Sequence, residues 1–397
     1  MTSTNTRDIF VVAAARTAIG TFGGSLKEVP LSTLATVAVR AALRRSGAEP
    51  AAVGHVVMGN VIPTEPRDAY LARVAGMDAG VPQETPAFNV NRLCGSGLQA
   101  IISAAQVIRL GEAEVAIGGG AESMSRGPYI LNSARWGARM GDVQTTDYML
   151  GILHDPFHRI HMGITAENVA RREGITRDMQ DALAVESQKR AEHAIKVGRF
   201  EEQIEPVEIE SRKGMVVFDT DEHVRAGATL EQLAGMKPVF EKQGTVTAGN
   251  SSGLNDGAAA VVLASDAALK GGQLKPMARL VSYAHAGVDP QLMGLGPVPA
   301  SQLALRRAGL KVADMDVIES NEAFAAQACA VSRLLDLDPA KVNPNGSGIS
   351  LGHPVGATGA IIVTKAIHEL QRVGGRYALV TMCIGGGQGI AAIFERT

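Results

Sequence analysis

The sequence contains few aromatic residues and has almost no net charge. One Trp, five Tyr and nine Phe make up 4% of the 397 residues, so the cores must be built mainly from Ala, Val, Ile and Leu. The 38 Lys and Arg residues nearly balance the 40 Asp and Glu residues, which leaves a formal net charge of -2. Such a chain has no field that collects nucleic acid or an anionic membrane surface. The composition therefore argues against binding of DNA, RNA or membranes as the main activity.

Cysteine is also scarce, and membrane or targeting segments are not evident. The three cysteines, Cys94, Cys329 and Cys383, are an odd number on a long chain, which argues against a disulfide framework and favours a reducing compartment. Residues 1–8 lack the apolar or Arg-rich run of a targeting peptide. No uninterrupted apolar run reaches the ~18 residues that a membrane helix needs. We therefore expect a cytoplasmic protein whose thiols are free.

Glycine, in contrast, is abundant with 45 residues, and the two ends of the chain resemble each other. Residues 42–47 (ALRRSG) return as residues 304–309 (ALRRAG), and Gly97 returns as Gly359, each pair being 262 residues apart. In both copies short apolar strands alternate with helices, a pattern typical of a mostly parallel sheet with helices on both faces. The sequence therefore predicts a duplicated α/β framework.

The first copy has the clearest elements. We expect helices over residues 34–45, capped by Ser32, and 97–110, and strands at 56–58 and 115–117. Three glycines at 118–120 follow the second strand, and three more at 385–387 match them in the second copy. Between the copies, in residues 123–247, the repeat is lost, which indicates an insertion. Its segment 154–162 (HDPFHRIHM) mixes apolar and cationic side chains, as a lid over an anionic, partly apolar ligand would. An irregular surface loop is the alternative.

Cys94 lies in the block NRLCGSGLQA (residues 91–100), where an extended run gives way to a helix. A helix N-terminus favours a thiolate there, whereas an isolated cysteine is more often a small buried apolar residue. Gly95, Gly97 and Ala100 also match the glycine pattern of a dinucleotide-binding loop. That loop requires an acidic residue about 20 positions later, and here the next strand ends in three glycines. A nucleophile is therefore favoured over a dinucleotide site.

His353 is followed by Pro354 and enclosed by glycines in a loop before a helix, roughly where Cys94 lies in the first copy. If the two copies face each other across a pseudo-twofold axis, the histidine and the cysteine converge. Together they are the parts of an activated thiolate nucleophile. A histidine that only satisfies its own loop is the alternative.

Cys383 ends an apolar strand directly before the glycines at 385–387. Ligands of α/β sheets bind beyond the carboxyl ends of strands, and glycine N–H groups there can bind an oxyanion. This thiol is therefore a candidate acid or base. The wide cysteine spacing, without a C-x-x-C pair, disfavours zinc, and we expect Cys329 in the core.

Six blocks in this order resemble the thiolase family, the coenzyme A dependent acetyl-CoA acetyltransferases and 3-ketoacyl-CoA thiolases. They are RTAIG at 16–20, NRLCGSG at 91–97, GGGAESM at 118–124, NEAF at 321–324, GHP at 352–354 and CIGGG at 383–387. The resemblance implies the thiolase fold, in which two α/β halves form a five-layered α-β-α-β-α core with an inserted loop domain. Residues 1–123, completed by about 254–275, would form the N-terminal half, residues 124–253 the inserted domain for tetramerisation and CoA binding, and residues 276–397 the C-terminal half.

The resemblance also implies a role for each catalytic candidate. Cys94 would carry the acyl group after activation by His353, and Cys383 would be the acid or base at the α-carbon of acetyl-CoA. Asn321, through a water, and His353 would hold the thioester oxygen of the second substrate. The backbone N–H groups of Cys94 and Gly385 would form the oxyanion hole of the acyl-enzyme. Coenzyme A would contact six residues: His161, Met162, Arg225, Ala248, Ser252 and Phe324.

The implied activity is that of an acetyl-CoA C-acetyltransferase or C-acyltransferase. Such an enzyme condenses acetyl-CoA with acyl-CoA reversibly, or thiolyses short-chain 3-ketoacyl-CoA, in fatty acid metabolism or the supply of polyhydroxyalkanoate precursors. The family implies no metal, no permanently bound cofactor, and a homotetramer built as a dimer of dimers, with residues 129–140 resembling a tetramerisation loop. Segment 154–161 resembles that of broader β-ketothiolases. The alternatives are a decarboxylating ketoacyl condensing enzyme, an NAD(P)-dependent oxidoreductase and a non-catalytic acyl-CoA binding protein.

Overall fold

The N-terminal half is built on five strands in the order β4-β3-β5-β10-β1. The computed structural model describes residues 7–212 and 214–397, so residues 1–6, where we expect no targeting signal, lie outside the described part. β3 runs parallel to β4 and β5, whereas β10 is antiparallel to β5 and β1. The strands are β1 (Ile9–Arg16), β3 (Val53–Gly59), β4 (Ala87–Val90), β5 (Val115–Ser123) and β10 (Asn255–Ser265), with the short β2 (Gly20–Thr21) beside β10.

The C-terminal half repeats this arrangement. Its order β12-β13-β14-β11 corresponds to β3-β5-β10-β1, with one parallel pair followed by antiparallel pairs. The strands are β11 (Ala278–Gly287), β12 (Val317–Ser320), β13 (Tyr377–Ile384) and β14 (Gln388–Arg396). The duplicated α/β framework is therefore confirmed, but the expectation of a mostly parallel sheet is wrong. A buried antiparallel strand is as uniformly apolar as a parallel one, so hydrophobicity alone did not separate them.

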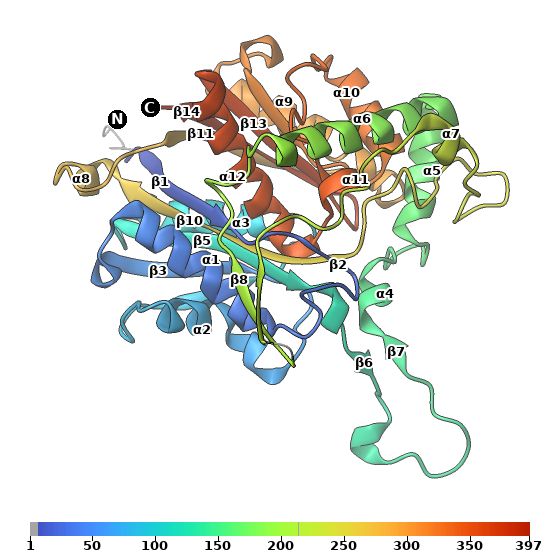
Figure 1. Cartoon of the computed structure of the whole chain (residues 1–397), viewed down its shortest axis with the longest axis horizontal. Helices are drawn as coiled ribbons and strands as arrows, with labels where there is room; N and C mark the ends of the chain where they lie inside the picture. The colour runs from blue at the N-terminus through green and yellow to red at the C-terminus, as the bar shows by residue number, and fades with distance from the viewer. Residues whose placement is uncertain (1–6, 213) are drawn as a thin grey trace.

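Helices cover the outer faces of the half-sheets and fill the space between them (Figure 1). α1 (Leu31–Ser46) packs on β1 and β10, and α9 (Pro297–Ala308) packs on β11 and β14. Between the halves, α3 (Ser96–Leu110) packs against α12 (Val355–Val373), which gives the five layers. The expected cap of α1 is wrong: Pro30 precedes the helix, and Ser32 lies buried in its first turn.

Glycines bring α3 and α12 into direct backbone contact. A Cβ atom on Gly97 would lie 2.6 Å from a backbone nitrogen of α12, and one on Gly359 would lie 2.3 Å from a backbone nitrogen of α3. The glycines at 118–120 lie inside β5, where a Cβ on Gly120 would lie 2.3 Å from a backbone oxygen of α12. Those at 385–387 instead connect β13 to β14, so the two triple glycines are not equivalent.

The stretch Leu93–Leu110, which contains α3, has the length and composition of a membrane span among the described residues. Its mean hydropathy is 1.3, but 67% of the stretch is buried inside the protein. The apolar character of α3 is therefore explained by its place between the two half-sheets.

The insertion leaves the sheet after β5 and returns to it at β10. Its first part extends from the body as an arm in which β6 (Tyr129–Ile130) pairs with β7 (Thr146–Asp147) (Figure 1). The later part packs on the C-terminal half, where α6 contacts α10 and α11. The remaining helices and strands are α2 (Leu71–Asp78), α4 (Tyr148–Ile152), α5 (Met162–Glu173), α6 (Arg177–Lys196), β8 (Val207–Ser211), β9 (Gly214–Phe218), α7 (Leu230–Ala234), α8 (Asp266–Leu269), α10 (Ala325–Leu334) and α11 (Gly348–Leu351).

A buried ion pair fastens the insertion to the sheet. Arg16, at the end of β1, reaches both carboxylate oxygens of Asp221 at 2.7 and 2.9 Å, and both side chains are 0% exposed. Asp221 also accepts the backbone N–H of Ile19 at 2.8 Å. The pair is bidentate and fully hydrogen-bonded, the condition under which burying two charges is tolerated.

Candidate active site

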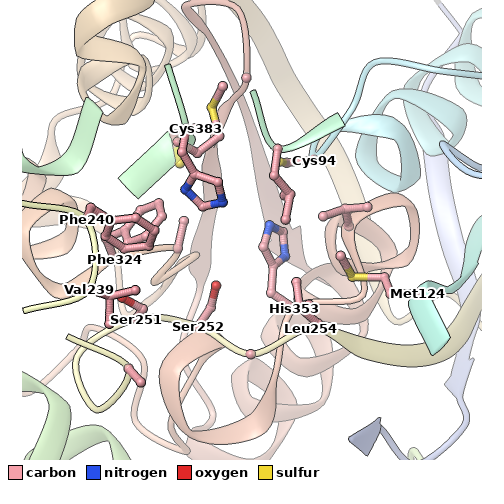
Figure 2. A pocket seen from close by; sticks show the side chains of 18 of the residues that line it. Cys94, Met124, Val239, Phe240, Ser251, Ser252, Leu254, Phe324, His353 and Cys383 are labelled. Carbon is pink, nitrogen blue, oxygen red and sulfur yellow. The ribbon is translucent and has the colours of Figure 1, made fainter. Parts of the chain in front are cut away.

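A cavity of about 420 Å³ lies where the end of β13 and the turn before α3 meet the insertion (Figure 2). Four of the five predicted catalytic residues line it: Cys94, His353, Cys383 and Gly385. The six residues predicted to contact coenzyme A line the same cavity: His161, Met162, Arg225, Ala248, Ser252 and Phe324. Asn321 is fully buried and does not line the cavity. The fold thus brings together residues from both copies and from the insertion.

A strained turn between β4 and α3 presents Cys94. Leu93 has a φ of 46°, a left-handed conformation that is rare for leucine. Ser96 holds the turn, because its Oγ accepts the Arg92 N–H at 2.8 Å and donates to the Leu93 carbonyl at 2.7 Å. A Cβ atom on Gly95 would lie 2.6 Å from a side chain of β13. Gly95 and Gly97 are therefore required by the close packing of this turn and of α3.

Burial controls the protonation of Cys94. Desolvation raises the pKa of its thiol from 9.0 to about 11, although the backbone N–H groups of Gly385 and of Cys94 itself act in the opposite direction. The backbone N–H groups at this turn favour the thiolate, as we expect of a helix N-terminus, but desolvation outweighs them. The thiol is protonated at neutral pH and needs a base. The two N–H groups that interact with the sulfur are the pair predicted to form the oxyanion hole.

His353 is placed to act as that base. Its backbone N–H donates to Oδ1 of Asn255 at 2.9 Å, and its Nδ1 lies 2.7 Å from Oγ1 of Thr358. Burial lowers the pKa of the imidazole to about 4, so the ring is neutral at neutral pH. Its Nε2 has no hydrogen-bond partner among the described residues. A neutral ring with a free nitrogen and a protonated thiol thus line one cavity (Figure 2).

Cys383 is a buried residue near the end of β13. Burial raises the pKa of its thiol, and the neighbouring Cys94 raises it further. Such a thiol holds its proton firmly and, once ionised, is a strong base, as proton transfer at carbon requires. In the turn that follows, Gly386 and Gly387 have φ values of 78° and 81°, which glycine adopts readily.

Asn321 lies directly after β12. Neither its Oδ1 nor its Nδ2 has a hydrogen-bond partner among the described residues, which is unusual for a fully buried amide. A Cβ atom on Gly348 would lie 2.8 Å from Oδ1 of Asn321, so glycine is needed beside it. An amide without protein partners is suited to the predicted water-mediated role, although the side chain does not line the cavity.

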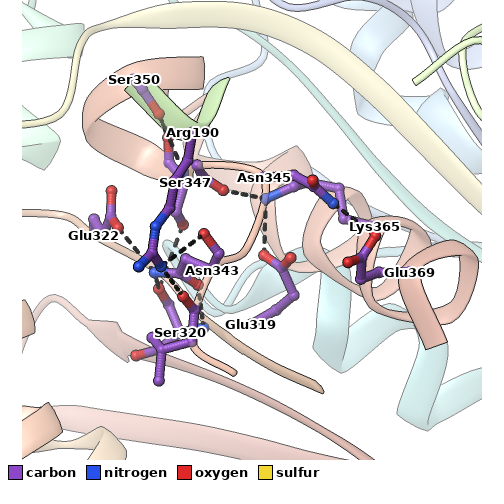
Figure 3. A network of polar contacts seen from close by, with 12 residues as sticks. Arg190, Glu319, Ser320, Glu322, Asn343, Asn345, Ser347, Ser350, Lys365 and Glu369 are labelled. Carbon is purple, nitrogen blue, oxygen red and sulfur yellow. Dashed lines mark hydrogen bonds and ion pairs between the residues drawn. The ribbon is translucent and has the colours of Figure 1, made fainter. Parts of the chain in front are cut away.

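A buried polar network holds the loop that carries the histidine against β12 (Figure 3). Glu322 accepts hydrogen bonds from Asn343 at 2.9 Å and from a serine of α6 at 2.6 Å. Lys365 of α12 bonds Glu319 at 2.8 Å and the carbonyl of Gly346 at 2.5 Å. This network could not be predicted from the sequence, because its members are scattered along the chain and form no motif; Glu322 alone lies in a recognised block.

Stacked rings form one wall of the cavity. His161 lies over Phe240 with centroids 4.7 Å apart and planes 19° apart, and Phe240 meets Phe324 edge-on at 6.3 Å. His154 forms a bridge and a ring contact with His161, so the predicted lid segment folds back on itself beside the cavity. Burial lowers the pKa of His161. The described lining contains one Lys or Arg side chain, that of Arg225.

Several apolar residues that complete the lining were not predicted from the sequence. Met124 ends the block GGGAESM, but most of the others are apolar side chains outside any motif, and such a signal does not distinguish a ligand wall from a core. These apolar residues include Met124, Leu150, Leu153, Val239, Phe240, Leu254, Met293 and Val355.

Comparisons with known proteins identify the family and the fold. The family model "Thiolase, N-terminal domain" matches residues 9–267, and "Thiolase, C-terminal domain" matches residues 274–396. The chain is 67% identical to the "Beta-ketothiolase BktB" of Cupriavidus necator, over 98% of this chain and 100% of that protein. It is 51% identical to an acetyl-CoA acetyltransferase of the same organism, over 98% and 99% of the two chains. The crystal structure of human mitochondrial 3-ketoacyl-CoA thiolase superposes with a TM-score of 0.97 at 47% identity, covering 98% of this chain and 99% of that one. The structure of that enzyme in complex with CoA has a TM-score of 0.95 and covers 98% of each chain.

Proposed function

The chain belongs to the thiolase family and has its acyltransferase activity, and from this premise we propose reversible condensation and thiolysis of short-chain 3-ketoacyl-CoA through an acyl-Cys94 intermediate. One observation carries the proposal: a protonated Cys94, a neutral His353 and a buried Cys383 line one cavity. The second thiol favours a thiolase over a decarboxylating condensing enzyme. A binding protein would have no use for this triad.

In the direction of thiolysis, His353 takes the proton of Cys94 and the sulfur attacks the C3 carbonyl carbon of the substrate. The bond between C2 and C3 breaks, and the acyl group remains on the sulfur. The electron pair of the broken bond forms the enolate of acetyl-CoA, whose oxygen is held by His353 and, through a water, by Asn321. Cys383 donates its proton to C2, and acetyl-CoA leaves.

In the second half-reaction, ionised Cys383 takes the proton of the incoming coenzyme A thiol, and the resulting sulfur attacks the acyl-Cys94 thioester. The backbone N–H groups of Cys94 and Gly385 hold the oxyanion, where one such donor is typically worth about 3–4 kcal/mol of barrier. Acyl-CoA leaves, and Cys94 regains its proton from His353. The reverse sequence is the condensation.

Coenzyme A enters along the wall formed by His161, Met162, Ala248, Ser252 and Phe324. This wall is largely apolar, as the pantetheine chain requires, and Arg225 supplies a cation for the anionic nucleotide end. A relative of nearly the same fold was solved in complex with CoA, which supports coenzyme A as the ligand.

The rest of the organisation follows the family. The N-terminal half comprises residues 1–123 and about 254–275, the inserted domain residues 124–253 and the C-terminal half residues 276–397. The protein works in the cytoplasm as a homotetramer without metal or permanent cofactor, in fatty acid metabolism or the supply of polyhydroxyalkanoate precursors. Trp136 and Met140 on the β6–β7 arm are 86% and 96% exposed, which supports burial of this arm in an assembly.

Two measurements test the proposal. After mixing with acetyl-CoA, we expect the acetyl group on the peptide that contains Cys94, and no labelled peptide in Cys94→Ala. Thiolysis kinetics from acetoacetyl-CoA to 3-ketodecanoyl-CoA then define the chain length. Full turnover by Cys94→Ala would refute the mechanism, and a flat profile would refute the short-chain preference.

A further inference from the structure

The first turn of α12 contains a hydrogen-bond sequence that ends at the catalytic imidazole. Oγ1 of Thr358 lies 2.9 Å from the carbonyl oxygen of Pro354, to which it donates, and 2.7 Å from Nδ1 of His353. Both residues are buried, so water does not replace either bond. A threonine in a helix commonly donates in this way to a carbonyl one turn earlier.

The count of hydrogens fixes the direction of the second bond. A hydroxyl carries one hydrogen and two lone pairs. Thr358 donates its hydrogen to the carbonyl of Pro354, which also accepts the backbone N–H groups of Ala357 and Thr358 at 2.9 Å each. With the hydroxyl hydrogen used there, its oxygen accepts from the ring, and the hydrogen of the imidazole lies on Nδ1 of His353. A neutral imidazole has one such hydrogen, so Nε2 is left with its lone pair. This is the nitrogen that has no partner among the described residues.

We propose that Thr358 is a positioning residue that fixes the tautomer of His353 with Nε2 as the free base. The proposal deepens the proposed function and rests on it for the role of the histidine. When the ring takes the Cys94 proton, Nδ1 keeps its hydrogen and its bond to Thr358. The same contact therefore serves the neutral and the charged ring, and proton transfer needs no rearrangement on that side.

Three substitutions separate this role from ordinary packing. Thr358→Val has nearly the same shape but removes the acceptor for Nδ1. Thr358→Ser keeps a hydroxyl at the same position. Thr364→Val is the matched control, because Thr364 is also buried in α12 and also donates to a carbonyl one turn earlier, that of Ala360 at 2.9 Å, but it has no histidine partner.

The tautomer is read directly by ¹⁵N NMR of histidine-labelled protein. In the wild type, the His353 signals should show a protonated Nδ1 and an unprotonated Nε2 at neutral pH, and in Thr358→Val the second tautomer should appear. The rate of Cys94 alkylation by iodoacetamide and kcat for thiolysis should both fall about 10- to 100-fold in Thr358→Val, part of the 10²–10⁴ that a general base supplies. KM should change little. Thr358→Ser should restore most of the rate, and Thr364→Val should leave the alkylation rate unchanged.

Two results would overturn the proposal. One is a wild-type spectrum with the hydrogen on Nε2. The other is a folded Thr358→Val protein whose alkylation rate equals that of Thr364→Val. Neither readout depends on carbon–carbon bond chemistry, so failure of the thiolase reaction with a normal His353 spectrum would refute the proposed function alone.

Discussion

The reactivity of Cys94 should depend on His353 in a way that pH exposes. Burial raises the pKa of the thiol from 9.0 to about 11. At pH 8 the thiolate fraction is then about 0.1%, against about 9% for an exposed thiol, a difference of about 100-fold or ~2.7 kcal/mol. Desolvation is the main cause of this shift, so we expect most of it to remain when the histidine is replaced.

The perturbation is His353→Asn, and the assay is the rate of Cys94 alkylation by iodoacetamide between pH 6 and 11. Without the histidine only a preformed thiolate reacts, so we expect the variant's rate to rise about tenfold per pH unit and to level off near pH 11. At pH 8 the variant should react about 100-fold more slowly than a free thiol of ordinary pKa. The wild type should react faster at pH 7, because His353 can take the proton while the sulfur attacks the reagent, a route that needs no preformed thiolate.

A matched control uses Cys94→Ser to confirm that the measured label is on Cys94, since Cys329 is also partly exposed. A variant rate that levels off below pH 9 would refute the reasoning, because it would mean that burial does not suppress the thiolate. Equal rates for variant and wild type at pH 7 would show that His353 is not the base.

Three further predictions concern the second thiol and the core. In Cys383→Ser we expect the acyl-enzyme to form normally from acetyl-CoA, with condensation reduced by orders of magnitude in a coupled assay; normal condensation would remove this thiol from the mechanism. Gly359→Ala should lower the free energy of unfolding, measured in urea, by about 1–3 kcal/mol, since its Cβ would lie 2.3 Å from the α3 backbone. The control is Gly151→Ala in α4, whose Cβ would meet no described atom within 4 Å and which should be neutral or stabilising. Equal changes in the two variants would contradict the packing argument. Arg16→Met should lower the free energy of unfolding by about 3–5 kcal/mol, because it leaves the buried carboxylate of Asp221 without its partner. The double variant Arg16→Met with Asp221→Leu should lose less, because it contains no unpaired charge. The difference between the two variants separates the effect of the charge from that of lost packing.

Most of the framework and the residues of the reactive centre could be predicted from the sequence, but the contacts that support them could not. The repeated glycines and the matching ALRR segments indicated a duplication, and the duplication predicted that Cys94 and His353 meet. The proton on Cys94 could not be predicted, because it depends on how far the turn is buried by β13 and the insertion. The prediction of parallel strands was wrong for a related reason. The antiparallel strand β10 follows the insertion in the sequence, and its local composition does not indicate which strands it pairs with.

The supporting residues were missed because their partners are distant or unmarked. Asn255 holds the backbone of His353 from a strand nearly a hundred positions away. Thr358 lies near the histidine in the sequence, yet its importance comes from the direction of one hydrogen bond. Phe240 has no motif around it, and only the folded insertion brings it to His161.

The place of β10 between β5 and β1 has a consequence for synthesis on the ribosome. Among the described strands β1 pairs with β10 and β11, apart from one bridge between Arg16 and Ile204, and β10 ends at Ser265. The apolar strand Ile9–Arg16 therefore emerges long before its partners in the sheet exist. At roughly 5–20 residues per second, this interval lasts on the order of 12–50 s. During that time the strand lacks its partners in the sheet, a state in which apolar strands are prone to aggregate. The sheet of the N-terminal half can therefore be completed only after the ribosome has synthesised the whole insertion.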